Sequence, residues 1–177
     1  YKIHNAGLNM INTISVLTGE VKTGKEGDIL ESNGIGSCII ISAWSFQKQT
    51  GAMAHVMLPG KAPEHSTSKT KYALDAINNL LEILKSNDIQ KNELIICLIG
   101  GANVLKKDDD SICRRNIESV TDILAERGLT VSASALGGTC RRTAKLETFT
   151  GKVYYSEGDS GLTLLHHSSL KETQKER

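Results

Sequence analysis

The chain has 177 residues, which fits one domain of ordinary size with its own hydrophobic core. Lys and Arg total 21 against 20 Asp and Glu, a net charge of +1 that gives no indication of nucleic-acid or anionic-membrane binding. No signal segment opens the chain and no apolar run approaches the roughly 20 residues that span a bilayer. We therefore expect a cytoplasmic protein without membrane insertion.

The first half of the chain is typical of strands separated by polar and glycine-containing turns. Runs rich in β-branched residues predict strands at 13–17, 37–44 and 52–58. Between 72 and 84 the apolar residues follow helical spacing, which predicts a helix with one buried stripe. The nearly all-apolar run at 93–99 ends at Gly100 and Gly101 and predicts a strand buried on both faces.

The second half continues with another helix and three strands. A helix is expected to begin near Ser111, after three aspartates that favour a helix N-terminus, and to end at Gly128. Strands are expected at 130–136, 144–149 and 152–155, the last two joined as a hairpin. The sequence predicts one mixed α/β domain at 1–165, followed by a polar tail at 166–177.

The first candidate for chemistry is a cysteine preceded by two glycines, in the sequence GIGSC at 34–38. Glycines allow sharp turns and close backbone approach, and here they precede Cys38 at the start of a predicted strand. A cysteine acts as a nucleophile in its thiolate form, so its pKa of about 8.5 must be lowered by a neighbouring group. A base near Cys38 is therefore required.

His55 is the candidate base, because it lies on the strand that follows the strand of Cys38. A polar turn near 45–51 separates the two strands, so a hairpin would place Cys38 and His55 opposite each other or one pair apart. Directly opposite Cβ atoms lie about 4.5–5.5 Å apart when the two residue numbers of each pair sum to an odd value. The sequence thus permits a Cys–His dyad.

Alternatives exist for each of these residues. Taken alone, Cys38 is read as a small buried hydrophobe and His55 as a core histidine with satisfied hydrogen bonds. Cys97 and Cys113 follow apolar patterns that predict core positions. Cys140 is the rival nucleophile, since neighbouring arginines could lower its thiol pKa, although no histidine is evident beside it.

No pattern predicts a cofactor or a metal. The cysteines have no zinc-site spacing, and the aspartates at 108–110 are explained as a solvated loop that precedes a helix. Ile39 stands where a dinucleotide fingerprint requires its third glycine, and a strand follows instead of a helix. His166 and His167 lack cysteine or acidic partners at ligand spacing.

The residues from about 19 to 153 resemble the CheD chemoreceptor glutamine deamidases of chemotaxis. The most specific part is GIGSC at 34–38 followed by GAMAHVMLP at 51–59, which is similar to the family's G-L-G-S-C and G-x-A-H-x-M-L-P pair. IGGAN at 99–103, RNI at 115–117, the GG at 137–138 with Arg142, and TGKV at 150–153 match further.

The resemblance implies a role for three side chains. Cys38 would be the nucleophile and His55 the general base, with Ser32 at the position of the family's catalytic threonine. Ser32 would orient the imidazole or hold its tautomer. Ala135-Leu136 and Arg141 depart from the acidic residue and the glycine that the family usually shows there.

The resemblance also implies a fold and a reaction. The fold would be an α/β arrangement with a β-sandwich-like core flanked by helices, shared with the catalytic domain of cytotoxic necrotizing factor toxins. Cys38 would attack a receptor glutamine carboxamide, releasing ammonia through a thioester, with the backbone N–H groups of Gly36 and Ser37 stabilising the oxyanion. No cofactor is required.

The implied partners are chemoreceptor cytoplasmic domains and a CheC-type phosphatase. Two other functions remain open. One is a regulatory binding module with little turnover, favoured by the departures at Ser32 and Arg141. The other is a cysteine hydrolase that acts on receptor methyl esters.

Overall fold

The computed structural model describes residues 11–167, and these form two sheets and two principal helices. The strands in this part of the chain are β1 Thr13–Ser15, β2 Val21–Gly24, β3 Ile29–Ile35, β4 Ile39–Ser45, β5 Thr50–Val56, β6 Leu94–Gly100, β7 Val131–Leu136, β8 Arg142–Glu147, β9 Val153–Glu157 and β10 Thr163–His166. The helices are α1 Ala73–Ser86 and α2 Ser111–Glu126, with short 3₁₀ turns at Lys69–Lys71 and Lys91–Glu93.

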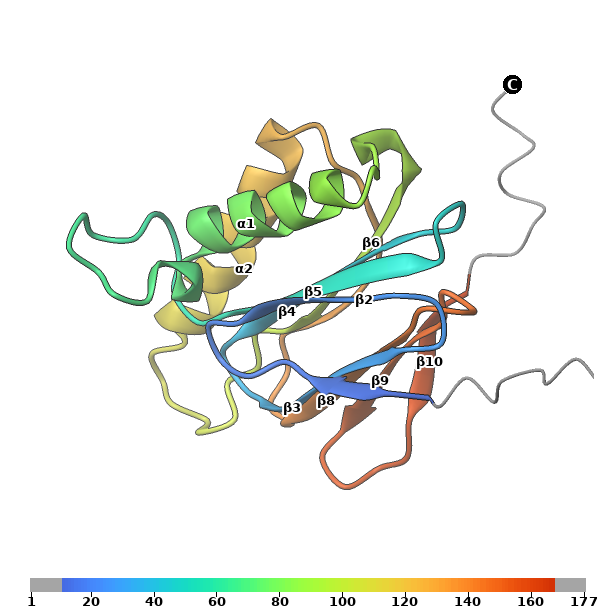
Figure 1. The fold of residues 1–177 in the computed structure, drawn as a ribbon. Helices are drawn as coiled ribbons and strands as arrows, with labels where there is room; N and C mark the ends of the chain where they lie inside the picture. The colour runs from blue at the N-terminus through green and yellow to red at the C-terminus, as the bar shows by residue number, and fades with distance from the viewer. Residues whose placement is uncertain (1–10, 168–177) are drawn as a thin grey trace, which may run out of the picture.

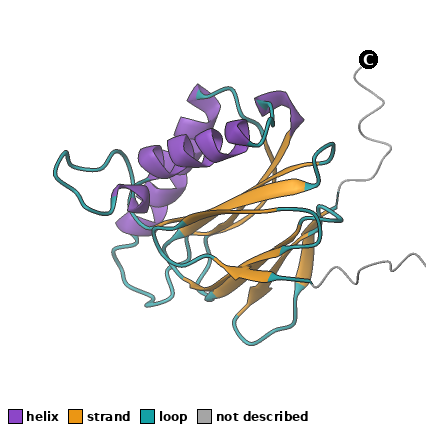
Figure 2. Ribbon diagram, viewed as in Figure 1, coloured by secondary structure: helices purple, strands orange, loops and turns teal. Residues whose placement is uncertain are grey.

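The elements stack in three layers, visible in Figure 1. One sheet has the strand order β1-β3-β8-β9-β10, and the other has the order β2-β5-β4-β6-β7. We call them the outer sheet and the central sheet, because both helices pack on the free face of the second one. Figure 2 shows the two helices together on that side and the two sheets face to face below them.

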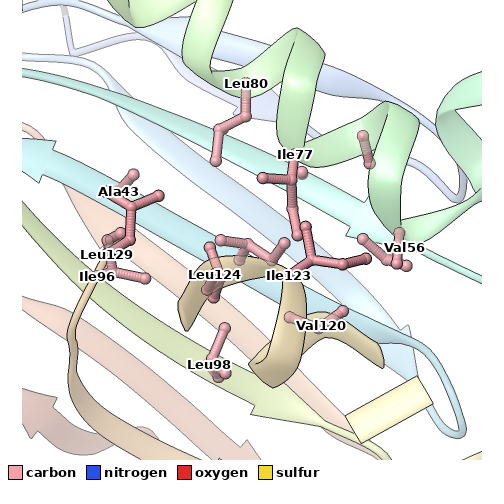
Figure 3. Close-up of a cluster of buried hydrophobic side chains, with 14 of the residues drawn as sticks. Ala43, Val56, Ile77, Leu80, Ile96, Leu98, Val120, Ile123, Leu124 and Leu129 are labelled. Atoms are coloured by element: carbon pink, nitrogen blue, oxygen red, sulfur yellow. The ribbon is translucent and has the colours of Figure 1, made fainter. Parts of the chain in front are cut away.

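The helices and the central sheet enclose one of two apolar cores. Figure 3 shows Ile77 and Leu80 of α1 and Val120 and Leu124 of α2 reaching toward Ile96 and other side chains of the sheet. Both helices carry their apolar residues on one face, as the spacing predicts. Full burial of each large aliphatic side chain stabilises the fold by about 1.5–3 kcal/mol.

The second core lies between the two sheets. It combines residues of both sheets, among them Leu30, Ile40, Trp44, Met53 and Leu146. Neighbouring residues of β4 belong to different cores, because side chains alternate along a strand. The face of the central sheet that carries even-numbered β4 residues therefore looks into the space between the sheets.

The mixed α/β class, both helices and the hairpin of β8 and β9 agree with the sequence analysis. Three strands were not predicted: β2, β3 and β10. β3 alternates between buried and less buried positions, and Leu30 and Ser32 are buried. The polar residues Glu31, Ser32 and Asn33 hide this alternation in the sequence. β10 reaches His166, one residue beyond the expected domain boundary, and the rest of the expected tail from 168 to 177 lies outside the described residues.

Candidate functional site

Cys38 lies where the chain crosses from the outer sheet to the central sheet. β3 of the outer sheet ends at Ile35, and β4 of the central sheet begins at Ile39. The pairing of β3 with β8 shifts register between Ser32 and Ile35, and Gly34 in this irregular stretch has φ +70°. Bulges of this kind bend a strand and redirect side chains. Cys38 is left half-buried directly before the first residue of β4.

The end of β6 holds the backbone on either side of this thiol. Gly101 N–H donates to Cys38 O at 2.8 Å, and Ala102 N–H donates to Gly36 O at 2.8 Å. Gly100 adopts φ +128°, and a Cβ atom there would overlap the carbonyl oxygen of Cys38. Glycine is therefore required at 100 both by conformation and by the close approach of the two backbones.

His55 lies on β5 and pairs with Ile40, so the residue numbers of each β4–β5 pair sum to 95. This odd sum agrees with the register condition of the sequence analysis. Cys38 precedes Ile40 by two positions and is thus the diagonal neighbour of His55 rather than its direct partner, on the face between the sheets. His55 is buried, with 3% of its surface exposed.

Ser32 crosses the gap between the sheets to reach His55. Its Oγ lies 2.9 Å from His55 Nδ1 and 2.7 Å from the carbonyl oxygen of Val16. A carbonyl oxygen can only accept, so the single hydroxyl proton of Ser32 goes to Val16 and Oγ accepts from Nδ1–H. The hydrogen of a neutral His55 is therefore on Nδ1.

This tautomer leaves Nε2 of His55 with a free lone pair. Nε2 is buried and has no hydrogen-bond partner among residues 11–167. An unprotonated ring nitrogen whose opposite nitrogen is fixed by a hydrogen bond is the arrangement required of a general base.

Burial keeps both groups of the pair neutral in the free protein. It raises the pKa of the Cys38 thiol, an effect opposed by the N–H of Cys38 itself and reinforced by the nearby thiol of Cys113. It lowers the pKa of the His55 imidazole, opposed by the Val16 backbone. The thiol pKa therefore moves upward, whereas the sequence analysis required a neighbour that lowers it. Any nucleophilic reaction of this thiol would have to remove its proton during the attack rather than beforehand.

Two buried polar side chains near Cys38 were not assigned roles in the sequence analysis. Asn116 of α2 donates from Nδ2 to Ser37 O at 2.9 Å and to Met57 O at 3.0 Å. Arg142 donates to Gly100 O at 3.3 Å and to Gly137 O at 2.7 Å, and it forms an ion pair with Glu157. The Ser37, Met57 and Gly100 carbonyls are distant in sequence from their donors, so no local pattern identifies these contacts, whereas Gly137 lies five residues before Arg142.

The other cysteines are placed as follows. Cys97 is fully buried between the sheets, where burial raises its pKa to about 12, and Cys113 is buried in the first turn of α2. Both agree with the predicted core positions. Cys140 is exposed in the loop between β7 and β8, and the guanidinium of Arg142 near this loop bonds carbonyl oxygens and Glu157.

His55 is among the residues that line a surface hollow of about 300 Å³. Its lining includes Val16, Leu17, Glu31 and Asn33 as well as His55. Cys38 is not part of this lining.

Residues 11–167 contain neither a cluster of metal-ligating side chains nor a helix that could cross a membrane. No group of three His, Cys, Asp or Glu side chains gathers as metal ligands would. Neither α1 nor α2 has the length and apolar character needed to cross a membrane.

The fold and the site define an α/β protein with a cysteine and a histidine on one face of a strand pair, and with a serine that orients the imidazole from a second sheet. Comparison with known proteins identifies the family. The profile described as "CheD chemotactic sensory transduction" matches residues 57–157, and the chain belongs to this family. The match begins after Cys38 and His55.

Relatives extend the similarity to most of the chain. A protein of Chlorobium luteolum named "Probable chemoreceptor glutamine deamidase CheD" is 38% identical over 148 residues, which cover 83% of this chain and 74% of the relative. Proteins with the same name from Methanococcus vannielii and Clostridium botulinum are each 34% identical, covering 82% and 81% of this chain and 96% and 92% of their own. The resemblance stated in the sequence analysis is confirmed at the level of the family.

Proposed function

We propose that this protein deamidates glutamine side chains of chemoreceptor cytoplasmic domains, with Cys38 as nucleophile, His55 as general base and Ser32 as the residue that orients His55. One observation carries the proposal. The Ser32 hydrogen bond places the hydrogen of neutral His55 on Nδ1 and leaves Nε2 free to accept a proton, on the sheet face that also carries Cys38. The names of the relatives supply the substrate class.

The reaction proceeds in two balanced steps. His55 Nε2 takes the Cys38 proton as sulfur attacks the carboxamide carbon, and the imidazolium returns that proton to nitrogen as the C–N bond breaks and ammonia leaves. Water, deprotonated by the same imidazole, then hydrolyses the thioester, which yields glutamate and restores the thiol. Neither step needs a metal or a cofactor.

The oxyanion formed in each step needs preorganised donors. We assign this role to backbone N–H groups of the segment from Gly36 to Cys38. The hydrogen bonds of Asn116 and Gly101 go to carbonyl oxygens of this segment and not to its N–H groups. Asn116 Nδ2 donates to Ser37 O, and Gly101 N–H donates to Cys38 O. Loss of one such donor costs roughly 100- to 1,000-fold in rate in other enzymes.

Intact mass spectrometry of a chemoreceptor cytoplasmic fragment tests the proposal. The fragment should gain the mass of amide-to-acid conversion with the unmodified protein and with a Cys140→Ala variant, which removes the exposed rival thiol. It should remain unchanged with Cys38→Ala. Conversion by Cys38→Ala would exclude Cys38 as the nucleophile, and conversion lost only in Cys140→Ala would transfer that role to Cys140.

The same experiment distinguishes the proposed deamidase from a regulatory binding module. With such a module no receptor fragment would be converted, whereas a receptor fragment or a CheC-type phosphatase would still bind. Hydrolysis of receptor methyl esters would appear in the same spectra as loss of a methyl group. We also propose that the fold is the one shared with the catalytic domain of cytotoxic necrotizing factor toxins.

A further inference from the structure

Asn116 is a fully buried amide in the second turn of α2, with 0% of its surface exposed. Both of its hydrogen bonds go to carbonyl oxygens next to the candidate site. One acceptor is Ser37 O, directly before Cys38, and the other is Met57 O, two residues after His55. The two acceptors lie 79 and 59 residues away along the chain.

The strand pairing explains why the Ser37 carbonyl needs this donor. The β4–β5 ladder ends at the pair Ile39 and Val56, and continuation of its register would pair Ser37 with Leu58. Leu58 N–H instead donates to Lys71 O at 2.9 Å, because the chain after β5 turns toward the start of α1. The two strands therefore separate at the level of Cys38, and the Asn116 amide bridges them there.

The orientation of the amide follows from its partners. Both neighbours are carbonyl oxygens, so only the NH₂ group can face them, and both of its protons are used. Oδ1 is then buried without a partner among residues 11–167. A buried acceptor without a partner destabilises the fold. Asn116 carries such an acceptor, and its NH₂ group links two segments of the site.

We propose that Asn116 is a positioning residue that fixes the separation of Cys38 and His55 by tying the chain before the thiol to the chain after the imidazole. This inference rests on the proposed function, because its main consequence is a change in turnover. A carboxylate at 116 keeps the shape of the side chain but presents two acceptors to two carbonyl oxygens, so the bridge would open.

The test compares Asn116→Asp with Val120→Ala, a variant of an equally buried α2 residue whose apolar side chain packs in the core under the helices and donates no hydrogen bond. Receptor deamidation by Asn116→Asp should show kcat lowered roughly 100-fold with KM within about twofold, since a small misplacement of reacting groups has that effect. Val120→Ala should lower the melting temperature and leave kcat near the unmodified value. Equal kcat loss in both variants at matched stability would overturn the proposal, as would unchanged kcat in Asn116→Asp.

A readout that needs no turnover separates this inference from the proposed function. Alkylation of Cys38 by iodoacetamide is followed against pH, with the exposed Cys140 as internal reference. For this readout Asn116→Leu replaces Asn116→Asp, because it removes the NH₂ group without adding a charge beside the thiol. Opening the bridge should give water better access to Cys38, and because burial raises its pKa, the labelling profile of Asn116→Leu should move to lower pH. If the unmodified protein converts no receptor, the proposed function fails, and an unchanged profile would then overturn the positioning role as well.

Asn116→Gln keeps the NH₂ group and serves where Asn116→Asp does not fold. It should recover part of the lost kcat and return the labelling profile toward that of the unmodified protein. Suppose instead that Asn116→Gln loses no more stability than Val120→Ala and yet recovers neither kcat nor the labelling profile of Cys38. That result would contradict a role for the NH₂ group.

Discussion

At His55, the partners of one ring nitrogen determine the chemistry available to the other. Ser32 gives its proton to Val16 and accepts from Nδ1, so Nε2 is the basic nitrogen in the neutral ring. Burial lowers the pKa of His55 and keeps the ring neutral to lower pH than an exposed histidine. Ser32 thus supplies the acceptor that fixes the tautomer of the neutral ring.

At this scale we predict that Ser32→Ala slows deamidation about tenfold, because a buried hydrogen bond with a net value of roughly 1.4 kcal/mol orients the base. The variant should also lose about 1–3 kcal/mol of unfolding free energy, since Val16 O and Nδ1–H lose their shared partner. Ser32→Thr retains the hydroxyl and is the control. Turnover of Ser32→Ala at the unmodified rate would show that Ser32 does not orient His55.

At the scale of elements, the site depends on how the end of β6 meets the start of β4. The conformation of Gly100 lets β6 pass against the Cys38 carbonyl, and the following residue donates to that carbonyl. The segment at 36–38 is therefore held by a neighbouring strand and by α2 rather than by its own turn alone.

We predict that Gly100→Ala lowers the unfolding free energy by about 2–5 kcal/mol, the sum of backbone strain and overlap with the Cys38 carbonyl. Gly128→Ala is the matched control, because Gly128 also has positive φ, at +71°, but a Cβ there meets nothing within 4 Å. Its expected cost is about 1–2 kcal/mol. Urea unfolding measures both variants, and equal losses would show that the close approach at Gly100 has no energetic weight.

For the whole molecule, the candidate site is part of the packing between the two sheets. The Ser32 to His55 bond joins the outer sheet to the central sheet within the same layer that buries Trp44 and Met53. Trp44, the single tryptophan of the sequence, donates from Nε1 to Thr148 O at 2.7 Å and reports on this packing.

We predict that the protein loses stability in mild acid partly through His55. Its pKa in the folded state lies below the ordinary value of 6.5, so the unfolded chain binds the proton first as pH falls. The contribution of neutral His55 is complete above about pH 6.5 and is lost as pH falls through the folded-state pKa. Urea unfolding followed by Trp44 fluorescence should show a smaller decline in His55→Gln as pH falls below about 6.5. The same decline in both proteins would contradict this origin.

Much of the local structure could be predicted from the sequence, because it depends on interactions between residues that are close together along the chain. The β4–β5 hairpin and both helices depend on turn residues and apolar spacing within short segments. β3 could not be recognised, since Ser32 occupies a buried position with a polar group that serves His55. The direction of the Cys38 pKa shift was also missed, because it depends on burial between layers.

The sequence by itself determined the family, the α/β class and the neighbourhood of Cys38 and His55 on one hairpin, because a hairpin register follows from a short turn and the two-residue alternation of strands. Only the tertiary structure decided the partner of each nitrogen of His55 and the link through Asn116. Those contacts join residues from different layers. Their geometry follows from how two sheets and a helix stack, which no local pattern of residues encodes.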